Sequence, residues 1–237
     1  MHINESLATT DSYQCRYCSK TFRKESTLAV HLCEPKRRWQ QEKETGVQFG
    51  FRAYLQFYET TQGSSRLKTY EDFVNSSYYN AFVRYGRYCV AVRAINSNSF
   101  TTWLLKNNKK LDQWCRDSYY EEWLHEYLRK EASQDALERG LREMAEYVDS
   151  GTSDLAHFSD YFRFGNTNRI CHHISTGRIS AWIIFNCDSG VEWLGSLGAE
   201  HLAMVMPWID PDHWHRRFSD NAADVEWSRH ILTQAGL

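Results

Sequence analysis

Apolar residues recur at the spacing of α-helices along most of the chain after residue 49. The clearest case is a stripe from Phe73 to Cys89, whose apolar side chains lie three and four residues apart. Such spacing places them on one face of a helix. Thr69 precedes the stripe and Asp72 follows three residues later, a pattern typical of a capped helix start. We therefore expect a helix that begins after Thr69 and buries one face.

Other segments are predicted to be helical on the same grounds. They cover residues 51–58, 103–105, 111–147 with a break at Ser133 as an N-cap, a short stretch from Ser153-Asp154 through Phe158, a stretch from Asp210-Pro211, and residues 221–234 behind Asp220. The segment Tyr161–Gly177 lacks a clear period and is expected to be irregular. The apolar run Ile179–Phe185 suits either a buried strand or a helix.

The fold class predicted from these patterns is mostly α. Only 3 prolines among 237 residues fit a chain of long helices, because proline breaks helix interiors. We expect a small N-terminal ββα unit in residues 1–35, a basic, polar linker or solvated helix in 36–48, and a multi-helical domain in 49–237. No apolar run is long enough to span a membrane, and the start lacks the features of a signal peptide. The expected location is the cytoplasm or a host-cell cytoplasm, without secretion or a membrane partner.

The small formal net charge of −2 conceals charge segregation along the chain. Residues 16–38 carry net +5 and residues 84–116 carry net +6, whereas residues 117–150 carry net −6. Basic blocks attract polyanions, although charged blocks are also typical of solvated helix faces. The block 84–116 interleaves aromatic residues with its cations, as single-stranded nucleic-acid binders do, but helical spacing directs most of them to a core. These aromatic residues are Tyr85, Tyr88, Phe100, Trp103 and Trp114.

Two cysteines and a histidine near the N-terminus have the spacing of a metal site. Two residues separate Cys15 from Cys18, which lets a tight turn present both thiols to one ion. Twelve residues then separate Cys18 from His31, enough for a turn and a helix that returns an imidazole to the same ion. Because a unit of this size buries too little surface to fold alone, one Zn²⁺ ion is the expected cofactor.

The same segment carries an aromatic residue, a phenylalanine and a leucine at fixed distances from these three residues. The full set is Tyr13, Cys15, Cys18, Phe22, Leu28 and His31. With this arrangement, residues 13–33 resemble a C2H2-type zinc finger. The resemblance implies a ββα fold around one structural zinc ion and a role in binding nucleic acid or protein.

The fourth ligand departs from the pattern of that family, which expects it at residues 35–37, where this chain has no donor side chain. Cys33 is the available donor. It reaches the same ion as His31 only if the helix ends there, because residues two apart on a helix point in nearly opposite directions. Pro35 favours such an end. The alternatives are a water ligand, with Cys33 as a small buried hydrophobe, or a finger without metal. The predicted ligands are Cys15, Cys18, His31 and Cys33.

The resemblance also assigns base-reading positions on a finger helix that begins near Lys24. They are Lys24, Thr27 and Val30, of which lysine reaches guanine acceptors, threonine contacts a base edge or a thymine methyl, and valine forms no hydrogen bond. The neighbouring cations suit phosphate contacts, which position a protein without specifying sequence. These cations are Lys20, Arg23, Lys36, Arg37 and Arg38. The alternative is a finger that docks a protein or serves folding alone.

Other clusters of reactive side chains give weaker signals. The Cys171–His173 triplet lacks a second pair of donors at metal-site spacing, and Asp210–His215 is better explained as a capped helix start. His125-Glu126 indicates a solvated helix face. The stretch Ile174–Trp182 followed by Asn186–Gly190 is a candidate functional loop without an assigned chemistry. The sequence has no Gly-rich phosphate loop, nucleophile elbow or HExxH pattern.

The expected function is nucleic-acid binding, with DNA favoured, through the finger and its basic tail, while the helical domain supplies a second contact or a partner site. One alternative is a protein-interaction adaptor in a phage or bacterial transcription or replication assembly. The less favoured one is a nucleic-acid-processing enzyme with its site around His172, Asp188 or Asp210. The phage setting comes from residues 174–190 and 210–237, which resemble uncharacterised proteins of T4-like tailed phages and imply no residue roles.

Overall fold

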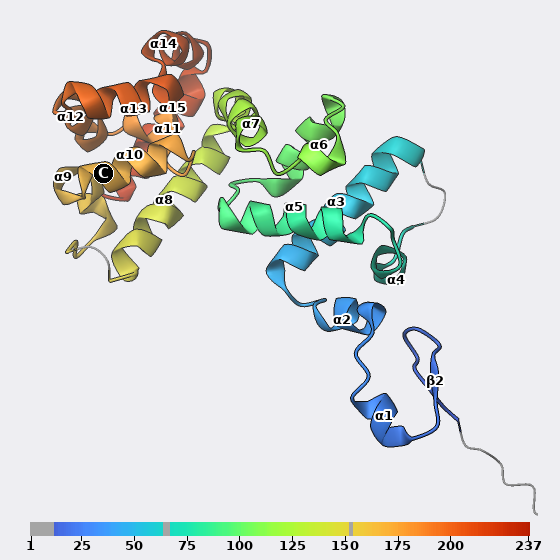
Figure 1. Ribbon diagram of the computed structural model, residues 1–237. Helices are drawn as coiled ribbons and strands as arrows, with labels where there is room; N and C mark the ends of the chain where they lie inside the picture. The colour runs from blue at the N-terminus through green and yellow to red at the C-terminus, as the bar shows by residue number, and fades with distance from the viewer. Residues whose placement is uncertain (1–11, 64–66, 152–153) are drawn as a thin grey trace, which may run out of the picture. The chain divides into compact units, whose positions relative to one another are not determined.

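The computed structural model describes residues 12–63, 67–151 and 154–237, and the chain divides into two compact units, 1–116 and 117–237. The described residues form fifteen α-helices, two short 3-10 helices and one two-stranded hairpin (Figure 1). The predicted mostly α fold with a small N-terminal ββα unit is confirmed. No helix in this part of the chain is long and apolar enough to cross a membrane.

The first unit begins with the ββα arrangement. Strands β1 (Tyr13–Gln14) and β2 (Thr21–Phe22) pair antiparallel, and helix α1 (Glu25–Ala29) follows them. Helix α2 (Glu34–Gln40) then occupies the first part of the segment 36–48. The basic residues Lys36, Arg37 and Arg38 therefore belong to a helix.

Helices α3 and α5 form the centre of the first unit. The elements after α2 are α3 (Thr45–Gln62), α4 (Tyr70–Val74), α5 (Tyr79–Ala91), α6 (Ser97–Lys106) and the 3-10 helix η1 (Leu111–Gln113). Helices α3 and α5 approach closely because Gly46, Gly50 and Gly86 carry no side chain at the crossing. A Cβ atom on Gly86 would overlap the Gly46 carbonyl oxygen. A substitution at this crossing would therefore force the two helices apart.

The capped helix start at Thr69 is confirmed. The Thr69 hydroxyl accepts a hydrogen bond from the Asp72 N–H (3.2 Å), and the Asp72 carboxylate accepts one from the Thr69 N–H (2.8 Å). The single helix expected from Phe73 to Cys89 is instead two helices, α4 and α5. Ser76 lies between them, and its hydroxyl accepts a hydrogen bond from the Tyr78 N–H (3.1 Å). Such local side-chain bonds compete with the helical ladder and account for the break.

Helix α2 is fixed to α4 and α5 by its last residues. The Arg38 guanidinium donates to the Val74 carbonyl (2.6 Å) and lies 4.5 Å from the centroid of the Tyr79 ring. The Trp39 ring meets the Tyr70 ring edge-on, with centroids 5.1 Å apart. The finger is thus followed by a helix that the helical part of the unit holds in place.

The second unit is helical throughout its described length. Its elements are α7 (Asp117–Lys130), α8 (Ser133–Asp149), η2 (Phe158–Asp160), α9 (Tyr161–Phe164), α10 (Thr167–Ser175), α11 (Ala181–Ile184), α12 (Asp188–Gly195), α13 (Ala199–Ile209), α14 (Pro211–Asp220) and α15 (Ala222–Gln234). The run Ile179–Phe185 is therefore a helix and not a strand. The capped start at Asp210 is confirmed, because its carboxylate accepts hydrogen bonds from the Asp212 and His213 N–H groups.

Four expectations for this unit were wrong. The segment Tyr161–Gly177 is not irregular, because it contains α9 and α10. Ser133 is the first residue of α8 and not its N-cap. Asp220 ends α14, and the residue that precedes α15 is Asn221.

The fourth is the short helix expected from Ser153-Asp154 through Phe158. Ser153 lies outside the described residues, residues 154–157 are not helical, and the 3-10 helix η2 begins only at Phe158.

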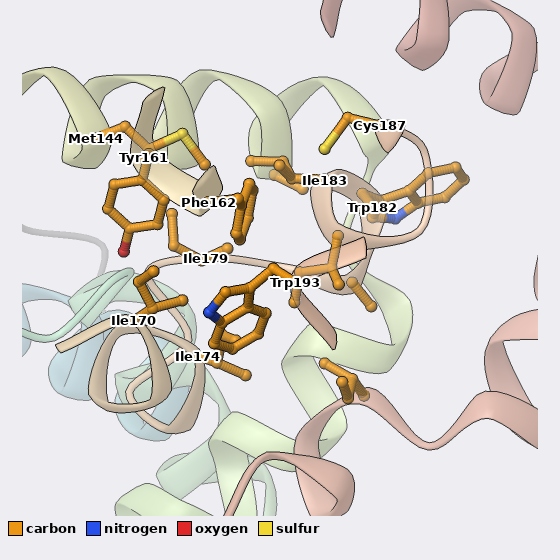
Figure 2. Close-up of a cluster of buried hydrophobic side chains, with 14 of the residues drawn as sticks. Met144, Tyr161, Phe162, Ile170, Ile174, Ile179, Trp182, Ile183, Cys187 and Trp193 are labelled. Atoms are coloured by element: carbon orange, nitrogen blue, oxygen red, sulfur yellow. The ribbon is translucent and has the colours of Figure 1, made fainter. Parts of the chain in front are cut away.

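The core of the second unit is built from large apolar side chains. Phe162 of α9 and Trp193 of α12 pack with ring centroids 5.8 Å apart, in the same cluster as Ile170 and Ile174 of α10 (Figure 2). All four side chains are buried. Helices α9 and α10 have only 4 and 9 residues, too few to be stable alone, so packing in this cluster stabilises them.

A polar group lies buried beside that core. The Tyr161 hydroxyl is 2.6 Å from His173 Nδ1, and His173 Nε2 is 3.7 Å from a Glu143 carboxylate oxygen. The Arg178 guanidinium lies 3.7 Å from the same oxygen. These contacts join α8, α9 and α10 through polar atoms, because a buried polar group needs partners.

Candidate metal centre

The turn between β1 and β2 carries the first two thiols. The Ser19 N–H donates to the Cys15 carbonyl (2.8 Å), and the Cys15 N–H donates to the Lys20 carbonyl (2.9 Å). Ser19 has a φ of 58°, in the left-handed region that residues other than glycine rarely adopt. The tight turn that results places Cys15 and Cys18 close together.

The other two donors lie between α1 and α2. Helix α1 ends at Ala29, so His31 and Cys33 are outside it, and Cys33 immediately precedes α2. The prediction that the helix ends in this region is confirmed, but Pro35 does not exclude helix at Glu34, which is the first residue of α2. Pro35 lies in the first turn of α2, where its missing N–H costs no helical hydrogen bond. Pro35 therefore lies after the end of α1 and at the start of α2.

The four donor atoms converge on one point of the finger. One donor atom each from Cys15, Cys18, His31 and Cys33 lies within 4.8 Å of the others. Cys15 Sγ is 3.9 Å from Cys33 Sγ, and Cys18 Sγ is 3.3 Å from His31 Nε2. In a tetrahedral site with zinc–sulfur bonds of about 2.3 Å and zinc–nitrogen bonds of about 2.0 Å, ligand atoms are about 3.5–3.8 Å apart. The donor set therefore fits a zinc ion.

Burial and hydrogen bonds act in opposite directions on the two turn thiols. Burial alone would raise the pKa of Cys15, but the N–H groups of Tyr17 and Cys18 point at its sulfur and hold that pKa below its usual value. The N–H of Lys20 lowers the pKa of Cys18, but burial and the two neighbouring thiols outweigh it and raise that pKa. Adjacent thiols resist joint deprotonation, so metal binding here would release protons.

The finger buries little besides this centre. Within residues 13–33, all of which the structure describes, Cys15 alone is buried. The Phe22 ring packs against the His31 ring with centroids 4.7 Å apart, and a hollow of about 370 Å³ opens beside Cys15 and Leu28. So small a core cannot offset the entropy of folding without a further source of stability.

The predicted nucleic-acid contacts fall into two groups. Those of α2 are engaged within the protein: Lys36 donates to the His31 carbonyl (3.0 Å), Arg37 pairs with Glu34, and Arg38 binds α4 and α5 as described. The others are exposed on the finger, and their side chains form no hydrogen bond or ion pair among the contacts described. They are Lys20, Arg23, Lys24 and Thr27.

Two apolar residues on the finger face solvent. Val30 is 81% exposed and Leu32 is 60% exposed, and they flank His31. Sequence analysis placed Val30 at a base-reading position and did not single out Leu32. The signal for Leu32 was available, because an apolar residue between two predicted ligands has no core to face.

In the block 84–116, most of the aromatic residues are buried and most of the cations are exposed. Tyr85, Phe100, Trp103 and Trp114 are buried, which confirms that helical spacing directs them to a core. The cations lie outside that core. Arg84, Arg87, Arg93, Lys106, Lys110 and Arg116 are exposed, and Lys109 is half-buried.

The remaining candidates do not form a second metal centre. Among the described residues, one group of at least three His, Cys, Asp or Glu side chains has donor atoms close enough to hold a metal ion, and it consists of Cys15, Cys18, His31 and Cys33. His173 is buried in α10, whereas His172 is exposed. Asp188 opens α12. Asp210 caps α14 and lies 3.2 Å from the Arg129 guanidinium. These positions favour structural roles.

No family model, curated protein or solved structure matches this chain.

Proposed function

We propose that residues 13–33 form a zinc-stabilised finger of the C2H2 type with a His-x-Cys end, and that the chain uses it to bind nucleic acid, with DNA favoured. The observation that carries the proposal is the convergence of the four donor atoms within 4.8 Å of one another. A zinc ion held by Cys15, Cys18, His31 and Cys33 would supply the stability that the small core of the finger lacks.

The charge of the unit that contains the finger supports a polyanionic partner. Residues 1–116 contain 18 Lys and Arg against 10 Asp and Glu, a formal net charge of +8, whereas residues 117–237 contain 10 against 20, a net charge of −10. Cations that neutralise phosphates gain affinity by releasing counterions. On the finger, Lys20, Arg23 and Lys24 are exposed and available for such contacts.

The finger offers few means of reading a base sequence. Helix α1 has only 5 residues, and among the base-reading positions only Lys24 and Thr27 carry polar side chains. Phosphate contacts position a protein on nucleic acid but do not specify sequence. We therefore expect affinity that depends steeply on salt and little on sequence.

Zinc stoichiometry tests the metal centre. The full-length protein should hold one zinc ion per chain, and Cys33→Ser should lose it to a mild chelator. Cys115→Ser is the matched control, because it removes a half-buried thiol outside the finger and should keep the zinc. Undiminished zinc retention by Cys33→Ser would remove Cys33 from the ligand set.

Salt-dependent affinity tests nucleic-acid binding. Alanine at Lys20, Arg23 and Lys24 should lower the slope of log affinity against log salt by about 3, since each phosphate contact contributes about 0.9. The control removes three exposed cations from the second unit and should leave the slope unchanged; these are Arg142, Arg163 and Arg229. Absence of binding to duplex and single strand, or binding insensitive to salt, would overturn the proposal.

A protein partner is the second candidate, and the exposed Val30 and Leu32 favour it. Aliphatic side chains do not bind phosphate, and neighbouring exposed ones suit a protein contact. The double variant Val30→Ser/Leu32→Ser separates the two functions. Reduced DNA affinity would place this pair in the nucleic-acid interface, and unchanged DNA affinity would leave it for an adaptor function.

A further inference from the structure

A group of cations lies on the helical part of the first unit, around the segment that joins α6 to η1. We name it the cationic corner. The sequence block 84–116 contains one acidic residue, Asp112. All its members except the half-buried Lys109 are exposed. The members are Arg84, Lys106, Lys109, Lys110 and Arg116.

Lys106 is the last residue of α6, and backbone hydrogen bonds fix the turn that follows it and carries Lys109 and Lys110. The Asn108 N–H donates to the Leu105 carbonyl (3.0 Å), and Asn108 adopts a left-handed φ of 51°. The Lys109 N–H donates to the Leu104 carbonyl (2.9 Å). The Lys109 carbonyl in turn accepts from the Trp114 indole (2.9 Å). The lysines therefore project from an ordered turn and not from a loose loop.

Arg84 joins α5 to the same corner. Its guanidinium donates to the backbone carbonyl of Asp112 (2.8 Å), so the contact leaves its positive charge uncompensated by the Asp112 carboxylate. The guanidinium also lowers the pKa of Cys115, although burial is the larger influence and raises it overall. Cations from two separate helices thus meet at one corner of the unit.

The aromatic residues under the corner are turned inward. Trp103 and Trp114 are buried, and the Lys109 ammonium lies 5.1 Å from the centroid of the Trp103 ring. Proteins that bind single strands combine cations with exposed rings on which bases stack. A corner with cations at the surface and its tryptophans in the core suits backbone phosphates, and duplex DNA presents them at a higher linear charge density than a single strand.

We propose that the cationic corner is a second phosphate-contact surface, which binds the backbone of duplex nucleic acid and adds affinity to that of the finger. The proposal rests on the proposed function, since it concerns the same ligand. A finger helix of 5 residues leaves most of the affinity to be supplied elsewhere. The corner belongs to the same compact unit as the finger, and that unit has a net charge of +8.

The test uses the full-length, zinc-loaded protein, a DNA duplex of about 20 base pairs and one of its strands, over a range of salt. The corner variant is Lys106→Ala/Lys110→Ala. The matched control is Lys43→Ala/Lys68→Ala, which removes two lysines from the same unit outside the corner. The corner variant should lower the salt slope for the duplex by about 2, and the control should leave it unchanged. The duplex should bind more tightly than the single strand.

The outcomes separate this proposal from the proposed function. If the corner variant binds like the wild type while alanine at Lys20, Arg23 and Lys24 weakens binding, the corner is not a contact surface and the finger still is. If neither set changes the slope, both proposals fail. A corner variant that loses thermal stability but not affinity would show that its lysines only stabilise the C-terminal end of α6, as cations do there. Equal affinity for the single strand would overturn the assignment to duplex.

Discussion

The finger and the second unit are stabilised in opposite ways. Within residues 13–33, Cys15 alone is buried, and four side chains converge on a candidate metal site. In the second unit, 20 buried residues form one hydrophobic cluster, with polar groups bonded beside it. Folding of the finger is therefore expected to depend on the binding of a metal ion, and folding of the second unit on the burial of apolar side chains. The two respond to different perturbations.

Removal of metal should have the largest effect and should act on the finger alone. A strong chelator is expected to unfold residues 13–33, since structural zinc contributes on the order of 10 kcal/mol in isolated fingers. Amide hydrogen exchange measures both regions in one sample. Protection should disappear in β1, β2 and α1 and persist in α8 and α10. A finger that keeps its protection without metal would show that packing suffices there.

Loss of a buried charge should have the next largest effect, and in the second unit. The Arg139 guanidinium lies 2.6 Å from the Glu131 carboxylate, whose side chain is 0% exposed. Arg139→Leu removes the guanidinium that pairs with this buried carboxylate, at a cost of about 3–5 kcal/mol in the free energy of unfolding. Arg142→Leu breaks an exposed pair with Glu138 and should cost about 0–1 kcal/mol. Urea unfolding compares them, and equal costs would contradict the role given to burial.

Tyr161→Phe should have a smaller effect on the same unit. It keeps the ring in the core and removes the hydroxyl that lies 2.6 Å from His173 Nδ1. A buried nitrogen that loses its partner costs about 1–3 kcal/mol. Tyr78→Phe, at a tyrosine that is 52% exposed, serves as the control and should change the thermal unfolding temperature little. A neutral Tyr161→Phe would show that the buried polar contacts contribute nothing net.

The smallest effect should be a pH dependence in the first unit. The Arg87 side chain donates hydrogen bonds to the Glu44 carboxylate (2.6 and 2.8 Å) and holds the pKa of Glu44 below its usual value. The folded state therefore gains stability above the ordinary glutamate pKa and loses it as the pH falls through the lowered one. Both partners are partly exposed, so the gain is below about 1 kcal/mol. Glu44→Gln should flatten this acid dependence in thermal unfolding, and an unchanged dependence would assign it to other carboxylates.

Sequence predicted the candidate site well because its geometry is local. The two residues between Cys15 and Cys18 set a tight turn, and the distance to His31 sets a helix. Cys33 followed as the available fourth donor from the steric rule that a continuous helix cannot present both His31 and Cys33 to one ion, whereas the expected effect of Pro35 on Glu34 was wrong, because Glu34 begins α2. The body of the protein contributes to these positions only through α2.

Sequence failed where long-range partners decide the structure. Segment Tyr161–Gly177 looked irregular because His173 interrupts the apolar pattern of α10. In the fold, this histidine is buried, with the Tyr161 hydroxyl bonded to its Nδ1 and a Glu143 carboxylate oxygen 3.7 Å from its Nε2. The spacing of apolar residues along one sequence does not reveal polar partners on other helices. In the block 84–116, by contrast, the helical spacing of the aromatic residues correctly predicted that most of them are buried.

The position of Cys33 ties the metal centre to the rest of the first unit. This thiol immediately precedes α2, which Arg38 and Trp39 fix to α4 and α5. The helical body therefore keeps the fourth donor at a high effective concentration near the other three. A peptide that ended at Cys33 would have to immobilise that thiol itself. If the centre holds zinc, a Cys33 thiol that dissociates in the full chain would stay within reach and rebind, so the body would slow the escape of the ion.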